Sequence, residues 1–180
     1  MSTYTDGGIL PMFNRLISFG DSFILGNELI DFETAEVPYS YKTFPALMAK
    51  QANIEYLCLA KAAASNQYIA HKILDYPFVN NELCIVQWTY SSRFGIPLEH
   101  SYELKNNSVI NWFDMRPHQI DEHEQVPHAL SKLSQDFYKQ VDIGTFGLFQ
   151  SELCVSYCAN YLHDKKVPYI FLCLDDDLIN

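Results

Sequence analysis

Short runs of continuous apolar residues recur along this 180-residue chain, with helix-forming segments between them. The runs occupy residues 16–19, 54–59, 83–88 and 168–174. Strands without polar alternation are typical of a parallel sheet covered on both faces, because each parallel connection needs a crossover that packs on the sheet. The pattern predicts an α/β fold: a three-layer α/β/α sandwich with a mainly parallel sheet, formed by one domain over residues 1–180.

The segments between the runs predict helices at residues 43–52, 66–74, 128–141 and 145–164. The last has the clearest period, with large apolar side chains three and four residues apart and a second stripe of Cys154, Cys158 and Leu162 beside them. The first stripe consists of Phe146, Phe149, Leu153, Tyr157 and Tyr161. Residues 95–127 show no sustained period, so we expect a long loop insertion there.

The composition of the chain limits the classes of partner that it is expected to bind. The formal net charge is −10 and the pI about 4.9, so the chain repels a phosphate backbone or an anionic membrane, and we expect neither nucleic acid nor membrane as a partner. No apolar run approaches the ~18 residues of a bilayer span, and the first residues lack a signal peptide. The five cysteines are odd in number and lie in apolar segments, which is typical of reduced core thiols and a cytoplasmic protein. Cys154 and Cys158 have no second ligand pair nearby, so we expect no metal and no cofactor.

Ligands of α/β sheets bind beyond the carboxyl ends of the strands. The residues that follow the first run are Gly20, Asp21 and Ser22. A serine at a strand end that leads into a helix exposes its hydroxyl near backbone N–H groups that could stabilise an oxyanion. The alternative interpretation is a simple turn, which all three residue types favour.

Gly20-Asp21-Ser22 in this position resembles the SGNH or GDSL hydrolase family, which has a flavodoxin-like architecture. The resemblance implies that Ser22 is the nucleophile. The block after the second strand, residues 60–66, places Ala63 where the family has an oxyanion glycine, and the block of residues 87–93 places Thr89 at the oxyanion asparagine. The same resemblance puts Asp21, Asn66 and Arg93 at the substrate, whereas ordinary strand packing is the competing explanation for Trp88 and Thr89.

The family closes its site with Asp-x-x-His near the C-terminus, and this motif does not occur in the 180 residues. We therefore expect a C-terminally incomplete domain, in which residues 168–174 form an exposed sheet edge that favours association. Two substitutes for the missing base deserve testing: a histidine of the predicted loop (His118, His123 or His128) and the acidic residues 175–177. A solvated acidic loop is the alternative for both.

Two functions remain open from the sequence. The first is an SGNH-like serine ester hydrolase, an esterase or carbohydrate O-deacetylase acting on a small ester or an acetylated glycan, with weak or no activity in this chain. The second is a non-catalytic SGNH-fold protein that binds a protein partner or forms a homo-oligomer. The resemblance is to a phage or marine bacterial subgroup, which would place the protein in a virion if it is encoded by a phage.

Overall fold

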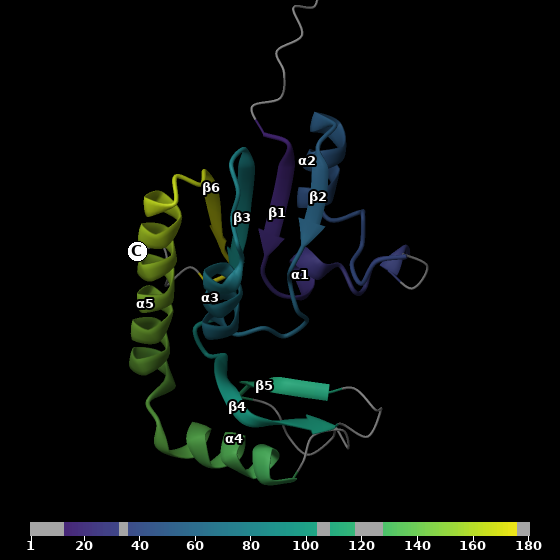
Figure 1. The fold of residues 1–180 in the computed structure, drawn as a ribbon. Helices are drawn as coiled ribbons and strands as arrows, with labels where there is room; N and C mark the ends of the chain where they lie inside the picture. The colour runs from purple at the N-terminus through teal and green to yellow at the C-terminus, as the bar shows by residue number, and fades with distance from the viewer. Residues whose placement is uncertain (1–12, 33–35, 104–108, 118–127, 176–180) are drawn as a thin grey trace, which may run out of the picture.

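The computed structural model describes residues 13–32, 36–103, 109–117 and 128–175 (Figure 1). Its main sheet contains four strands, all parallel, in the order β2-β1-β3-β6. The strands are β1 (Arg15–Phe19), β2 (Glu55–Cys58), β3 (Glu82–Trp88) and β6 (Tyr169–Cys173). The prediction of an α/β fold with a mainly parallel sheet is confirmed.

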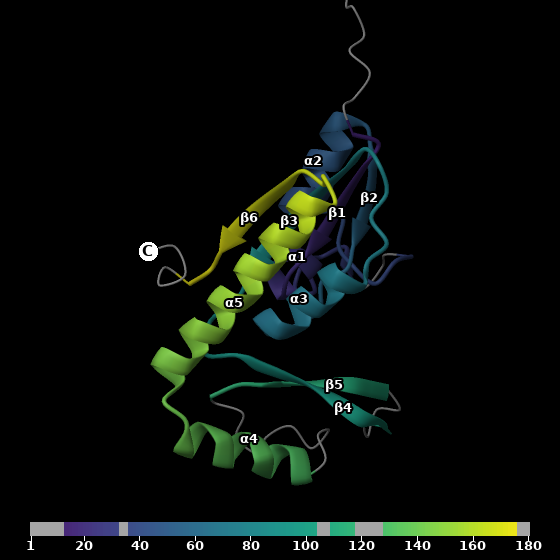
Figure 2. The same ribbon diagram turned by 60° about the vertical axis from the view of Figure 1, so that its left-hand side comes forward.

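Helices lie on both faces of this sheet, because successive strand residues point to opposite sides. On one face Ile17, Val86 and Trp88 are buried against α3 (Asn66–Asp75) and α5 (Ile143–Asp164). On the other face Leu16 and Ile85 are buried with Ala49 of α2 (Phe44–Ala52). The arrangement is compatible with three layers, and Figure 2 shows α3 and α5 together on one side of the sheet.

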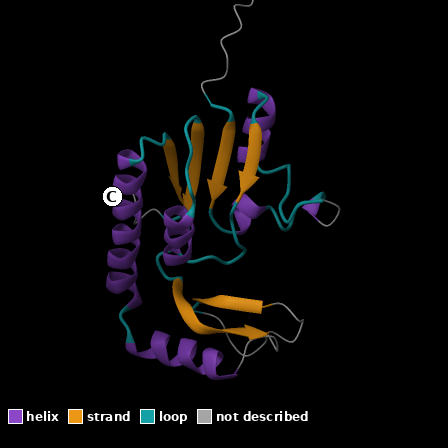
Figure 3. Cartoon of the chain, viewed as in Figure 1, coloured by secondary structure: helices purple, strands orange, loops and turns teal. Residues whose placement is uncertain are grey.

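The predicted loop insertion of residues 95–127 was wrong over its described part. It contains an antiparallel pair, β4 (Phe94–Glu103) and β5 (Val109–Met115), while residues 118–127 lie outside the described part. The pair lies beyond the carboxyl ends of the main strands, with α4 (His128–Gln140) on its far side (Figure 3). Phe113 and Met115 pack towards α4, and the alternate residues Trp112 and Asp114 face α3 and the loop before it. The alternation was hidden from sequence analysis because both faces of this pair are partly covered.

The α5 helix begins and ends close to its predicted limits. The stripe that contacts the sheet is the second one, which contains Cys158 and Leu162, and not the stripe of large side chains that begins at Phe146. Gly147, Ser151, Cys158 and Leu162 are buried, whereas Phe149, Leu153 and Tyr157 are 50–64% exposed. Small side chains allow the helix to approach the end of β3, since a Cβ on Gly147 would overlap the backbone oxygen of Ser91. Close packing, and not total apolar area, selects the buried stripe.

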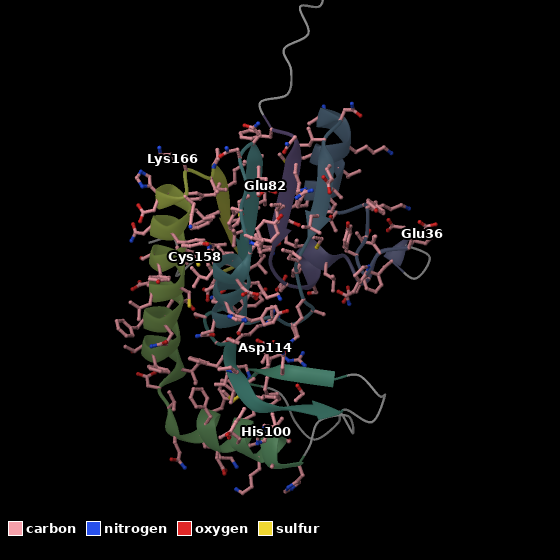
Figure 4. All side chains as sticks on the ribbon, viewed as in Figure 1. Glu36, Glu82, His100, Asp114, Cys158 and Lys166 are labelled. Carbon is pink, nitrogen blue, oxygen red and sulfur yellow. The ribbon has the colours of Figure 1, made fainter. Side chains whose placement is uncertain are left out.

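The five cysteines are all free thiols, and burial raises the pKa of Cys158 to about 12 (labelled in Figure 4). Within the described ranges no helix is both long and apolar enough to cross a membrane.

Candidate functional site

The ends of the first three strands meet at one edge of the sheet. The backbone N–H of Lys61, after β2, donates to the carbonyl of Gly20, after β1, at 3.1 Å. The hydroxyl of Thr89, after β3, donates to Asp21 at 3.0 Å. The structure therefore brings together the three blocks that the sequence singled out.

Asp21 is the centre of a buried polar cluster. One carboxylate oxygen accepts from the N–H of Phe23 and caps α1 (Ser22–Leu25). The other accepts from the Thr89 hydroxyl and, at 2.8 Å, from the guanidinium of Arg93. The Asp21 side chain is fully buried, and that of Arg93 is 17% exposed and lies over the ring of Tyr90. Asp21 thus fixes the start of α1 and the positions of Thr89 and Arg93.

Ser22 is the first residue of α1 and is half-buried. Neither its hydroxyl nor its backbone N–H has a hydrogen-bond partner among the described residues. It borders a cavity of about 270 Å³ lined also by Phe23, Gly26, Glu28 and Leu29. Gly20 is needed two residues before this serine, because a Cβ there would come within 2.6 Å of Ile24. These contacts leave the Ser22 hydroxyl available to a ligand.

Ala63 lies in a turn closed by a hydrogen bond from the N–H of Ala64 to the carbonyl of Lys61. Its φ is +59°, a left-handed conformation that glycine adopts without strain and alanine does not. The Ala63 N–H, like that of Ser22, finds no acceptor in the described part of the chain. Ala63 therefore occupies a strained backbone position that a glycine would fill without strain.

Replacing Ala63 with glycine is expected to raise the free energy of unfolding by about 0.5–1 kcal/mol. The substitution removes about 1–2 kcal/mol of left-handed strain and adds about 0.4–1 kcal/mol of unfolded-state entropy. The neighbouring Ala62 is exposed and is not among the residues with positive φ, so Ala62→Gly is the matched control and should be destabilising. Urea unfolding measures both, and destabilisation by Ala63→Gly would contradict the strain argument.

Thr89 and Asn66 are fully buried and bond to each other. The Asn66 amide accepts from the Thr89 N–H at 2.8 Å and donates to the Thr89 carbonyl and to the hydroxyl of Ser151. The Thr89 hydroxyl proton points to Asp21, and its oxygen accepts from Arg93. Asn66 therefore aligns the end of β3, and Thr89 presents its hydroxyl to protein groups.

Of the proposed substitutes for a base, those in the described part of the chain do not bond to Ser22. The described histidines are His71, His100, His128 and His163; all are exposed, and none bonds to Ser22. His71 stacks on Trp112 with ring centroids 5.1 Å apart. Asp175 accepts from the N–H of Ser91. His118, His123 and residues 176–177 lie outside the described residues.

The sequence places Asp114 among the acids of a predicted solvated loop, whereas its side chain is 5% exposed. Asp114 of β5 bonds to the ammonium of Lys61 at 2.6 Å and accepts from both the N–H and the hydroxyl of Ser65 (Figure 4). Burial and, secondly, the charge of Asp114 raise the pKa of nearby Tyr68. Ser65 caps α3, which the residue type could have indicated, but its pairing with Asp114 spans 49 residues and had no local signal.

Among the described residues, no group of three or more His, Cys, Asp or Glu side chains could hold a metal ion. The arrangement is instead a serine hydroxyl on the loop after β1, connected to the turn that carries Ala63 by the hydrogen bond from Lys61 to Gly20. In comparisons with known proteins, no family model, curated protein or solved structure matches the chain.

Proposed function

We propose that the chain is an SGNH-like serine ester hydrolase, an esterase or carbohydrate O-deacetylase with weak activity, in which Ser22 is the nucleophile. The observation that carries the proposal is a Ser22 hydroxyl without a hydrogen-bond partner among the described residues, on a loop that the Lys61–Gly20 bond joins to the turn of Ala63. The backbone N–H groups of Ser22 and Ala63 likewise have no acceptor there. Backbone donors with no internal acceptor are what a developing oxyanion requires. The strand order β2-β1-β3-β6 also follows the 2-1-3-4 order of flavodoxin-like sheets.

In the proposed reaction the Ser22 oxygen attacks the ester carbonyl carbon, and the carbonyl oxygen becomes an oxyanion held by the two N–H groups. The carbon–oxygen bond to the leaving alcohol then breaks, and the alcohol takes up the proton that the serine lost. Water hydrolyses the acyl-serine and regenerates the hydroxyl. Thr89 joins the oxyanion hole only if its hydroxyl turns from Asp21.

Weak activity follows from the surroundings of the serine. A positioned general base contributes about 10²–10⁴-fold, and none lies within hydrogen-bond distance of Ser22 among the described residues. The two cations of the adjoining loops, Arg93 and Lys61, are each paired with a carboxylate, so they offset little of the charge of an oxyanion. The substrate class that this proposal implies is a small activated ester or an acetylated glycan.

Hydrolysis of p-nitrophenyl acetate and labelling by a fluorophosphonate test the proposal. We expect slow turnover, covalent labelling at Ser22, and loss of both in Ser22→Ala. Ser156→Ala changes an exposed serine of α5 and is the matched control, with both signals retained. An unlabelled wild type whose rate is the same in Ser22→Ala contradicts the proposal. Fast turnover that depends on Ser22 contradicts the weak activity, and alanine variants of His118, His123 and His128 then identify the base.

Partner binding is a second candidate function, and the β6 edge favours it. Among the described residues β6 is the last strand of the sheet. Its sequence YIFLC has no charge, and Tyr169, Ile170 and Leu172 are 36–42% exposed. An open apolar edge pairs readily with another strand. We propose a second copy of this chain as its occupant, because two identical edges related by a two-fold axis satisfy each other in antiparallel register.

Sedimentation velocity checks this self-association. We expect wild-type dimers at high protein concentration and monomers for Ile170→Lys, since a buried lysine at the edge opposes pairing. Leu153→Lys alters a residue that is 50% exposed on a helix, α5, and not on the edge strand, and should leave the dimer intact. A monomeric wild type, or equal effects of the two variants, would show that the edge does not pair.

A further inference from the structure

We infer that Asp114 is a positioning residue for the oxyanion hole: its carboxylate holds both ends of the turn that carries Ala63. The inference rests on the proposed function of Ser22 and extends it to the β4–β5 pair, which is outside the sheet that carries the serine. One oxygen of Asp114 binds Lys61, the first residue of the turn, and the other accepts twice from Ser65, the residue after the turn.

The turn between these two points is strained and needs such support. Alanine at a φ of +59° is unfavourable, and a residue in such a conformation persists only where the surrounding structure over-determines it. The Asp114 side chain is 5% exposed, so little water competes for its hydrogen bonds. The direction of the Ala63 N–H is therefore set by contacts from β5 as well as by the turn itself.

The same turn is connected to the nucleophile loop. The backbone N–H of Lys61 donates to the carbonyl of Gly20, two residues before Ser22. Lys61 thus bonds through its backbone to the Ser22 loop and through its ammonium to Asp114. If the contacts of Asp114 with Lys61 and Ser65 shifted, Ala63 would move relative to Ser22. The backbone N–H groups of these two residues are the proposed oxyanion donors.

The β4–β5 pair is itself held against α3, so that Asp114 has a fixed position. Trp112 stacks on His71 and meets the edge of the Tyr68 ring. Gly95, opposite Asp114 in the strand pair, donates its N–H to Gln67. A Cβ on Gly95 would overlap the hydroxyl of Ser65, so a glycine here permits the close approach on which the Asp114 contacts depend.

Fluorophosphonate inactivation of the full chain tests the inference, with the maximal rate of Ser22 labelling measured separately from the concentration at half-maximal rate. Asp114→Ala should lower the maximal rate about 10²-fold, the effect typical of a displaced group near the reacting atoms, without changing the half-maximal concentration. Asp114→Asn keeps an oxygen that accepts from Ser65 and should retain the rate to within about tenfold. Asp136→Ala removes a carboxylate from an exposed ion pair with Lys132 and serves as control, with no change.

Amide hydrogen exchange at Ala64, whose N–H closes the turn, measures how firmly Asp114 holds the turn. This measurement does not depend on any reaction at Ser22. We expect exchange at Ala64 to become at least about tenfold faster in Asp114→Ala but not in Asp136→Ala, as local opening becomes easier. If wild-type Ser22 is not labelled, the proposed function fails, and the exchange result still decides whether Asp114 holds the turn. Unchanged labelling and unchanged exchange in a folded Asp114→Ala protein would overturn the inference.

Discussion

Replacing Asp21 with alanine is expected to lower the free energy of unfolding by about 3–4 kcal/mol. The substitution leaves the guanidinium of Arg93 without its carboxylate and the hydroxyl proton of Thr89 without its acceptor, in a region where the Asp21 side chain is fully buried. Breaking a buried ion pair by removing one partner costs about 3–5 kcal/mol, here reduced because Arg93 is 17% exposed. Loss of the α1 cap adds about 1 kcal/mol. Equilibrium urea unfolding gives the value.

A double variant separates the cost of the unpaired Arg93 charge from the cost of the lost α1 cap, and a second variant is the control. In Asp21→Ala with Arg93→Met no unpaired charge remains, so part of the lost stability should return. Asp136→Ala breaks an exposed pair on α4 and should leave the unfolding free energy unchanged. If Asp21→Ala alone proves as mild as Asp136→Ala, then the cluster around Asp21 does not stabilise the fold.

Replacing Asn66 with alanine should lower the free energy of unfolding by about 3–5 kcal/mol. The amide satisfies the N–H and carbonyl of Thr89 and also bonds to Ser151. All three residues are fully buried, and an unsatisfied buried polar group costs about 1–3 kcal/mol. Because Asn66 belongs to α3, Thr89 directly follows β3 and Ser151 belongs to α5, the variant loses a connection between three parts of the fold.

Asn160→Ala is the control for that measurement. It removes the same side chain from an exposed position of α5 and should be neutral or slightly stabilising, since alanine is the better helix former. Thermal unfolding by circular dichroism is the second measurement for both variants. A loss below 1 kcal/mol for Asn66→Ala would mean that Thr89 finds other partners.

The site was only partly predictable. Gly20, Asp21 and Ser22 could be placed at a strand end because a short apolar run that stops at a turn residue is a local pattern. The roles of Asp21, Asn66 and Thr89 as a bonded, buried group had no such pattern, since Asn66 and Thr89 are 23 residues apart and Asp21 and Thr89 are 68 apart. Their assignment to substrate or oxyanion stays a prediction.

The two functional proposals depend on different kinds of information. Ser22 as a nucleophile begins from a motif that is visible in the sequence. Asp114 as a positioning residue is visible only after β5 has packed against the loop before α3, because no motif connects residues 114 and 65. A histidine base remains a prediction for the part of the chain that the structure does not describe.

The sequence alone determined which segments form the main strands and helices. Continuous apolar runs and helix-forming segments are set by neighbouring residues, so β1, β3, α3 and α5 lie where the sequence predicts them. The tertiary structure decided which stripe of α5 is buried, that residues 94–103 and 109–115 pair as strands, and which polar groups meet at the sheet edge. These outcomes depend on the close fit of side chains that are far apart in the chain, and a hydrophobic period contains no information about that fit.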